Sequence, residues 1–297
     1  MSNKPRKMTL EKKHNLTGWA FLAPATFLIA VFSFWPMIKA LVLSFQTGKG
    51  RNMQMAGFTN YIRMFQDDVF IQSIKNTFFY FILQVPIMLV VAMVLACILN
   101  KKDLRFKGFF RTMIFLPCTT SLVAYSIIFR SLFANDGLVN YVLVNLGILD
   151  KPYNFLTQPF AAKIVIILAL LWRWTGYNMV FFLSGLQNIE YSVYEAAKID
   201  GASAIQTFFK ITVPLLKPTI LLTAIMSTNG TLLLFDESIN LTDGGPANAS
   251  ISMSHYIYNL CFKYVPNFGY AAAMSFFILL LVAVLAFIQM RVGDKRD

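Results

Sequence analysis

Long apolar runs constrain the fold of this chain more than any other feature. Several runs exceed the ~20 residues that an α-helix needs to cross a bilayer. Hydrophobic residues make up 57% of the 297-residue sequence and charged residues only 13%, whereas a soluble domain carries about a quarter charged residues. Lipid accommodates only helices or closed barrels, and these runs are too long and unalternating for barrel strands. The sequence therefore predicts an all-α, polytopic membrane protein.

The apolar runs predict six membrane spans, separated by polar or basic segments. The first run follows a basic tail, residues 1–17, and so imitates a signal peptide, but its length and the later spans identify an uncleaved anchor. Residues 18–291 then form one membrane domain, and residues 292–297 form a second short tail. The predicted spans are Gly18–Phe45, Phe70–Leu99, Phe109–Phe133, Phe160–Leu186, Leu215–Leu234 and Phe268–Met290.

The net charge of +12 follows the membrane topology and does not indicate a nucleic-acid partner. Lys and Arg concentrate in residues 1–17, 101–111, 195–218 and 291–296. These regions alternate with less basic loops, which is the positive-inside pattern. We therefore expect both termini to lie in the cytoplasm, around an even number of spans.

A polar island, residues 195–218, lies between two long apolar runs and is expected at the membrane surface. Good helix formers at 195–198 favour a first helix, which Gly201 ends because glycine inside a helix costs about 1 kcal/mol relative to alanine. Ser203 can cap a second helix at 204–212. Four side chains of that helix are expected on one apolar face: Ile205, Phe208, Phe209 and Thr212.

The order of residue types in this island resembles the EAA loop of permease subunits of ATP-binding-cassette (ABC) importers. The resemblance implies that two short helices dock on a cytoplasmic ATPase subunit and carry its closure into the membrane. It assigns this ATPase coupling to Glu195, Ala196, Ala197, Asp200, Gly201, Ala202, Phe208 and Phe209. An ordinary amphipathic cytoplasmic loop is the alternative interpretation.

The chain also resembles the sugar-uptake branch of this family, in particular the first permease of maltose-, glycerol-3-phosphate- and multiple-sugar-type importers. The added support is an opening helix with a late Trp35-Pro36 and the turn LTDGGPANAS at 241–250. The two extra leading spans and the large outer insertion of maltose-type members are missing. The resemblance implies the type I ABC importer permease fold in a prokaryotic cytoplasmic membrane.

The same resemblance implies the partners of the chain. They are a second, similar six-span permease, two copies of an ABC ATPase, an external sugar-binding protein and a mono- or oligosaccharide substrate. The sequence holds no GxxxxGK[ST] loop for ATP, so no cofactor is expected on this chain and ATP would be bound by the ATPase subunits.

Substrate contacts are placed by the resemblance on the spans before and after the EAA loop. By position these residues are Trp174, Tyr177, Asn178, Ser227, Gly230, Thr231 and Leu234. Spacings of three and four place each set on one helix face, and aromatic rings beside hydroxyl and amide groups suit a small-molecule site. Packing against a neighbouring helix is an equally open interpretation of each residue.

Three charged residues keep several possible roles. A charge is costly in lipid, so Arg173 must face protein, water or a headgroup, where it either stabilises the bundle or lines a polar path. Asp236 and Glu237 follow the fifth span. They could close a gate, meet the binding protein or be solvated, and solvation is the default expectation.

An ion-coupled secondary carrier or an integral membrane enzyme is the second hypothesis. Such carriers commonly show repeats and carboxylates at the membrane midplane, and an enzyme would need paired acids or histidine clusters there. The sequence shows neither, and Cys97, Cys118 and Cys261 have no metal or disulfide spacing. The prediction is therefore a non-catalytic permease subunit that forms half of the translocation path of an ATP-driven sugar importer.

Overall fold

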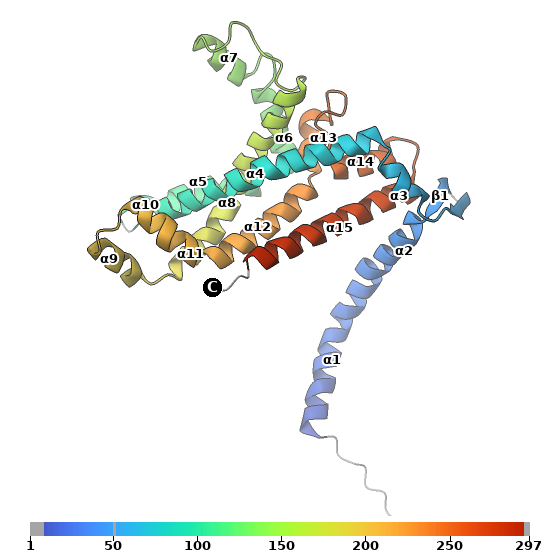
Figure 1. The fold of residues 1–297 in the computed structure, drawn as a ribbon, viewed down its shortest axis with the longest axis horizontal. Coiled ribbons are helices and arrows are strands. Elements are labelled where there is room, and N and C mark those ends of the chain that lie inside the picture. The colour runs from blue at the N-terminus through green and yellow to red at the C-terminus, as the bar shows by residue number, and fades with distance from the viewer. Residues whose placement is uncertain (1–8, 50–51, 102, 294–297) are drawn as a thin grey trace, which may run out of the picture.

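Apolar helices dominate the structure, as the sequence predicts. This computed structural model describes residues 9–49, 52–101 and 103–293. Four helical stretches are long and apolar enough to cross a membrane, and two bent helix pairs would bring the number to six (Figure 1). Residues 1–8 and 294–297 of the two predicted tails lie outside the described residues.

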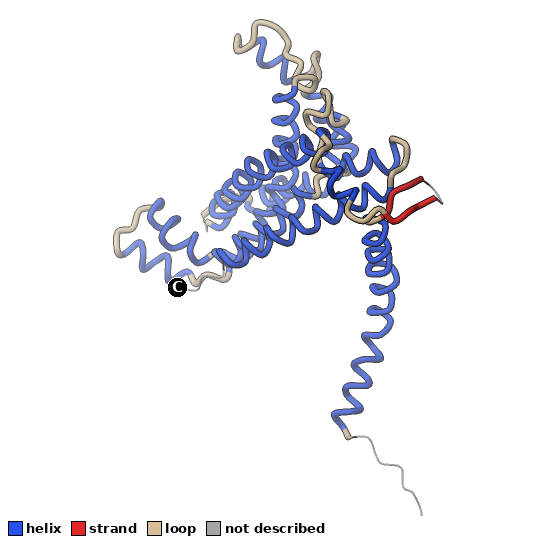
Figure 2. The backbone as a smooth tube through the Cα atoms, turned by 45° about the vertical axis from the view of Figure 1, so that its right-hand side comes forward, coloured by secondary structure: helices blue, strands red, loops and turns tan. Residues whose placement is uncertain are grey.

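The first span is one continuous helix that leaves the bundle at a wide angle (Figures 1 and 2). It consists of α1 (Leu10–Ile29), the π-helical η1 (Ala30–Phe34) and α2 (Trp35–Ser44). The helix starts before the predicted Gly18, so residues 10–17 extend it and do not form an irregular tail. No residue of α1 is buried within the chain.

A small hairpin and a short helix connect this span to the bundle. Strands β1 (Gln46–Lys49) and β2 (Asn52–Met55) pair antiparallel with Gln46 opposite Met55, and α3 (Thr59–Met64) follows. Gly269 of the last span lies against this corner, where an added Cβ would overlap the carbonyl oxygen of Gln46. Only glycine therefore permits this close approach of the last helix.

The centre of the bundle is the pair α4 (Asp68–Asn100) and α8 (Pro159–Gln187), flanked by α12 (Lys217–Leu232) and α15 (Phe268–Gly293) (Figure 1). Small and large side chains interlock between α4 and α8 towards the end that leads into the polar island. They are Ala92, Met93, Ala96 and Leu99 on α4 and Met179, Phe182, Leu183 and Leu186 on α8.

The predicted third span, Phe109–Phe133, is a bent pair of helices and not one straight helix. Helices α5 (Lys107–Thr119) and α6 (Leu122–Leu132) meet at a bend of 98°. Pro117 lies just before the break and removes a backbone donor. Side chains of Thr119 and Thr120 bond the carbonyls of Leu116 and Pro117. Beyond α6 the chain forms the short helix α7 (Leu138–Asn145).

The fifth span is also bent. Residues 204–215 form one helical stretch made of α10 (Ala204–Thr207), η2 (Phe208–Thr212) and α11 (Val213–Leu215), and the chain turns by 72° before α12. This confirms the predicted helix over 204–212. The span ends at Leu232, before the predicted Leu234, and α13 (Asp236–Thr242) follows.

One carboxylate ties three helices together at the end of the bundle opposite the polar island (Figure 1). Asp67 caps α4, because its Oδ1 accepts from the backbone N–H groups of Val69 and Phe70 at 3.0 and 3.2 Å. Its Oδ2 accepts from the hydroxyls of Tyr256 and Tyr270, both at 2.7 Å. These tyrosines belong to α14 (Met253–Tyr258) and to α15, and α14 continues as η3 (Asn259–Lys263).

We predict that Asp67→Ala destabilises this end of the bundle. The variant loses a helix cap, which contributes about 1 kcal/mol to stability. It also leaves two buried tyrosine hydroxyls without their acceptor, at a further cost of about 1–3 kcal/mol. Thermal unfolding of the detergent-purified protein should show a clearly lower Tm. Asp68→Ala, which removes the exposed neighbouring acid, is the matched control. Equal Tm values for the two variants would contradict the role of Asp67.

Candidate functional site

The polar island folds into two helices separated by a turn whose backbone N–H groups are all hydrogen-bonded. Helix α9 (Tyr191–Ile199) ends with Gly201 at φ +73°, a left-handed conformation that favours glycine. The N–H of Gly201 donates to the carbonyl of Lys198 at 3.2 Å, and the N–H of Ala202 donates to that of Ala197 at 2.9 Å. This pair of bonds is a Schellman motif. The bend is therefore fixed in shape.

A capping box begins the second helix of the island. The Ser203 hydroxyl accepts from the Gln206 N–H at 3.2 Å, and the Gln206 side chain accepts from the Ser203 N–H at 2.8 Å. Both ends of the four-residue turn between α9 and α10, residues 200–203, are thus closed by hydrogen bonds. The predicted break at Gly201 and cap at Ser203 are confirmed.

The predicted apolar face of the second helix is divided between core and surface. Ile205 and Phe209 are 72% and 65% exposed. Phe208 packs on the α4–α8 cluster, and Thr212 is buried with its hydroxyl 3.4 Å from that of Tyr194. Residues four apart on a helix share a direction, so one pair turns inward and the other outward. The expectation of one face shared by all four is wrong.

The other residues predicted to couple to the ATPase lie in the same island as Phe208 and Phe209. Glu195, Ala196, Asp200 and Gly201 are exposed, Ala202 is half-buried, and Ala197 is buried against the rest of the island. Ile199 is 86% exposed beside them. The island and the C-terminal end of α15 lie at the same end of the bundle (Figure 1). The loop therefore presents an acid and several apolar side chains outward.

A second feature is a cavity of about 350 Å³ between α4, α8, α12 and α13, which we call the central cavity. The seven residues placed on a substrate path by the family resemblance all line it: Trp174, Tyr177, Asn178, Ser227, Gly230, Thr231 and Leu234. Two helices separated by the whole polar island thus contribute to one space. The sequence did not indicate the contribution of α4, which adds Gln84 and Met88.

Polar side chains in the central cavity are paired across helices. The Thr231 hydroxyl donates to Gln84 Oε1 at 2.8 Å, and the Ser227 hydroxyl donates to Asn178 Oδ1 at 3.2 Å. Apart from its own helix backbone, no atom of the described residues lies within 4 Å of a Cβ added to Gly230. Gln84 could have been found in the sequence, because it is an amide inside the apolar run YFILQVPIML.

Arg173 combines both roles that the sequence left open. It is 5% exposed, and one terminal nitrogen donates to the carbonyl of Thr120 at 2.9 Å, at the break between α5 and α6. Its guanidinium lies 4.7 Å from the ring centroid of Tyr125 and 5.3 Å from that of Trp174. It also lines the central cavity. The side chain therefore stabilises a broken span and faces a polar space.

Glu237 is buried, so the default expectation of solvation is wrong for this residue. It is 4% exposed and accepts a hydrogen bond from the Tyr125 hydroxyl at 2.5 Å. Burial raises the pKa of Glu237, and the bond from Tyr125 opposes this shift. Asp236 is half-buried, and both residues line the central cavity.

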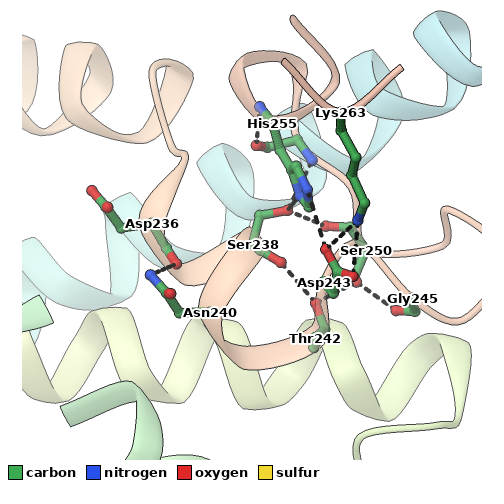
Figure 3. Close-up of polar contacts among 10 residues, drawn as sticks. Asp236, Ser238, Asn240, Thr242, Asp243, Gly245, Ser250, His255 and Lys263 are labelled. Carbon is green, nitrogen blue, oxygen red and sulfur yellow. Dashed lines mark hydrogen bonds and ion pairs between the residues drawn. The ribbon is translucent and has the colours of Figure 1, made fainter. Parts of the chain in front are cut away.

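A network of hydroxyls holds α13 in place (Figure 3). The Ser238 hydroxyl lies 3.0 Å from Nδ1 of His255, and the Thr242 and Ser250 hydroxyls lie 2.7 Å apart. Burial lowers the pKa of His255 to about 4, so its ring is neutral near pH 7. At the exposed edge, Lys263 donates to both oxygens of Asp243 at 3.0 Å. The two acids of the cavity are therefore carried on a fixed helix.

Known proteins resemble this chain over nearly its full length. The lactose transport system permease protein of Rhizobium radiobacter is 51% identical over 292 residues, covering 98% of each chain. The multiple sugar-binding transport system permease protein of Streptococcus mutans is 34% identical, covering 97% of this chain and 99% of the relative. A solved bacterial alginate ABC transporter, in complex with an alginate pentasaccharide-bound periplasmic protein, matches with a TM-score of 0.84 and 25% identity over 98% of each chain.

These relatives confirm the prediction of a non-catalytic transport permease, and the carrier and enzyme alternatives find no support in them. Residues 68–296 match the family described as the inner membrane component of binding-protein-dependent transport systems. The match includes the polar island, both cavity-lining spans and the last span. The chain therefore belongs to the family of binding-protein-dependent transport system inner membrane components.

Proposed function

We propose that this chain is one of two different permease subunits of an ATP-driven sugar importer. The exposed two-helix island is the observation that carries the proposal. It combines a hydrogen-bonded bend with outward-facing Glu195, Ile199, Ile205 and Phe209 at the end of a membrane bundle. An apolar surface of this kind, outside the lipid, marks a protein contact. Sugar as the substrate is supported by the lactose and multiple-sugar permeases among the relatives.

The proposed partners follow from surfaces that the chain leaves uncovered. Two ABC ATPase subunits would bind ATP, and one would dock on the island of this chain. A second six-span permease would cover part of the first span, since α1 buries no residue within the chain. An external sugar-binding protein would deliver the substrate, as the periplasmic protein bound to the alginate transporter suggests.

The proposed orientation places the island and both termini in the cytoplasm, with the chain in a prokaryotic cytoplasmic membrane. The basic regions at 101–111 and 195–218 support this orientation. Sugar would pass through the central cavity. Trp174 and Tyr177 would stack on the apolar face of the sugar ring. Asn178, Ser227 and Thr231 would form hydrogen bonds with the sugar hydroxyls.

We predict that Glu195→Ala combined with Gly201→Ala uncouples transport. The first change removes an outward acid, and the second strains a left-handed position by roughly 1–2 kcal/mol. Because coupling free energies between sites are about 1–3 kcal/mol, ATP-driven uptake by the reconstituted complex should fall on the order of tenfold or more.

Glu190→Ala, at an exposed acid of the same loop, is the control for the coupling variant. Co-purification of the complex confirms that the double variant is still inserted and assembled. Unchanged uptake by an assembled double variant would refute the coupling role of the island.

A second prediction concerns the size of the central cavity. Gly230→Phe should fold normally, because there is open space beside Gly230 and replacing a helical glycine favours the helix. The ring would occupy substrate space, so sugar uptake should fall at least about tenfold in a cavity that must enclose most of its ligand. Gly108→Phe is the control, since Gly108 on α5 also has open space around it but does not line the cavity. Equal uptake by the two variants would place the substrate path elsewhere.

A further inference from the structure

We infer that Arg173, Asp236 and Glu237 determine the charge of the substrate: together they hold neighbouring hydroxyls of a neutral sugar and disfavour acidic sugars. The inference rests on the proposed function and adds a substrate class to it. The three residues line one part of the central cavity, which we call the charged wall.

Arg173 offers an unused donor at the charged wall. The residue is only 5% exposed, and its buried Nε has no hydrogen-bond partner among the described residues. Buried polar groups in proteins are nearly always satisfied, so an unpaired one requires an explanation. The donation to Thr120 and the stacking on Tyr125 and Trp174 fix the guanidinium in place. Because Nε itself has almost no accessible surface, the donor open to a substrate hydroxyl is the second terminal nitrogen, Nη2, which has no hydrogen-bond partner among the described residues.

The two carboxyl groups supply acceptors beside this donor. Glu237 is held by the Tyr125 hydroxyl and by the rigid seating of α13. Within the part of the chain that the structure describes, no carboxylate oxygen lies within 4.0 Å of an Arg173 nitrogen. The acids and the arginine therefore do not neutralise each other by direct pairing. Each remains available to a ligand.

A fixed guanidinium beside fixed carboxyl groups matches the chemistry of a sugar. Each sugar hydroxyl can donate one hydrogen bond and accept others, whereas guanidinium only donates and carboxylate only accepts. Two neighbouring hydroxyls can accept from Arg173 and donate to Glu237 or Asp236. Trp174 and Tyr177 also line the cavity, on the same helix as Arg173, and their aromatic rings could stack on the apolar face of the sugar ring.

The balance of charge at this wall disfavours an anion. One guanidinium stands beside two carboxyl groups, so the formal charge of the wall is negative when both acids are ionised and zero when Glu237 is protonated. In neither state does the wall carry the net positive charge that would attract an anion. Like charges repel strongly where the surroundings are less polar than water. The solved alginate transporter handles an acidic polysaccharide, so the shared fold does not fix the charge of the substrate. Local side chains do.

The test uses the complete importer, with partner permease, ATPase and binding protein, in proteoliposomes. The probes are lactose and an arabino-oligosaccharide as neutral sugars, with lactobionate as the acidic one. Glu237→Gln keeps the size of the side chain and an oxygen that can accept from Tyr125, but removes the charge. We expect neutral-sugar uptake by this variant to fall on the order of tenfold. ATP hydrolysis stimulated by sugar-loaded binding protein should stay within about twofold of wild type, because coupling and docking are untouched.

Charge selection is tested by Asp236→Asn combined with Glu237→Gln. Because the binding protein is the same in every assay, a rise in the ratio of lactobionate to lactose uptake reports on the permease, and we expect such a rise. Asp136→Asn, at an exposed outer acid, is the control.

The inference would be overturned if Glu237→Gln took up neutral sugar within about twofold of the wild-type rate. It would also be overturned if uptake and stimulated ATP hydrolysis fell in parallel, because a parallel loss indicates that Glu237 has a structural role only. Failure of the wild-type complex to take up any sugar with ATP would instead refute the proposed function itself.

Discussion

The architecture depends on how the chain satisfies backbone polar groups where its membrane helices stop. In a bilayer an unpaired carbonyl or N–H is costly, so a break is tolerated only where protein groups replace the lost helical bonds. At the α5–α6 break the carbonyl of Thr120 accepts from Arg173. At the end of α12 the carbonyl of Leu234 accepts from the Ser252 hydroxyl at 2.5 Å. Both supporting side chains come from distant parts of the sequence.

These two breaks also create the central cavity. Straight helices packed side by side would fill the space with side chains, but α6 turns away at 98° and α13 begins at the end of α12. The cavity therefore lies where the bundle opens. At the same level α5 approaches α8 closely, since a Cβ on Gly176 would overlap the carbonyl of Ile114. The bundle is thus open beside the central cavity, while α5 and α8 pack tightly against each other.

The sequence predicted those parts of the structure that depend on local chemistry. Apolar run length identified the membrane helices, and Gly201 and Ser203 marked the bend of the island, because a left-handed residue and a cap act within a few positions. The breaks were harder to predict. Pro117 was visible, but the bend also needs Arg173, 53 positions from Thr120. Glu237 appeared solvated because its partner, Tyr125, lies 112 positions away. Long-range pairs of this kind leave no local pattern.

The connectivity links the island directly to the walls of the cavity. Helix α8, which carries Arg173 to Asn178, leads into the island, and α12, which carries Ser227 to Thr231, leads out of it. The two helices touch near the island, where Gly185 leaves room for Leu216 and Thr219. Since the island is stiffened by its Schellman motif and capping box, a force applied to it cannot be absorbed by a flexible loop. Displacement of α9 and α10 can therefore reach α8 through the short link of residues 188–190 and α12 through the bend at Leu216. The central cavity and the exposed surface of the island thus lie at two ends of the same pair of helices, α8 and α12.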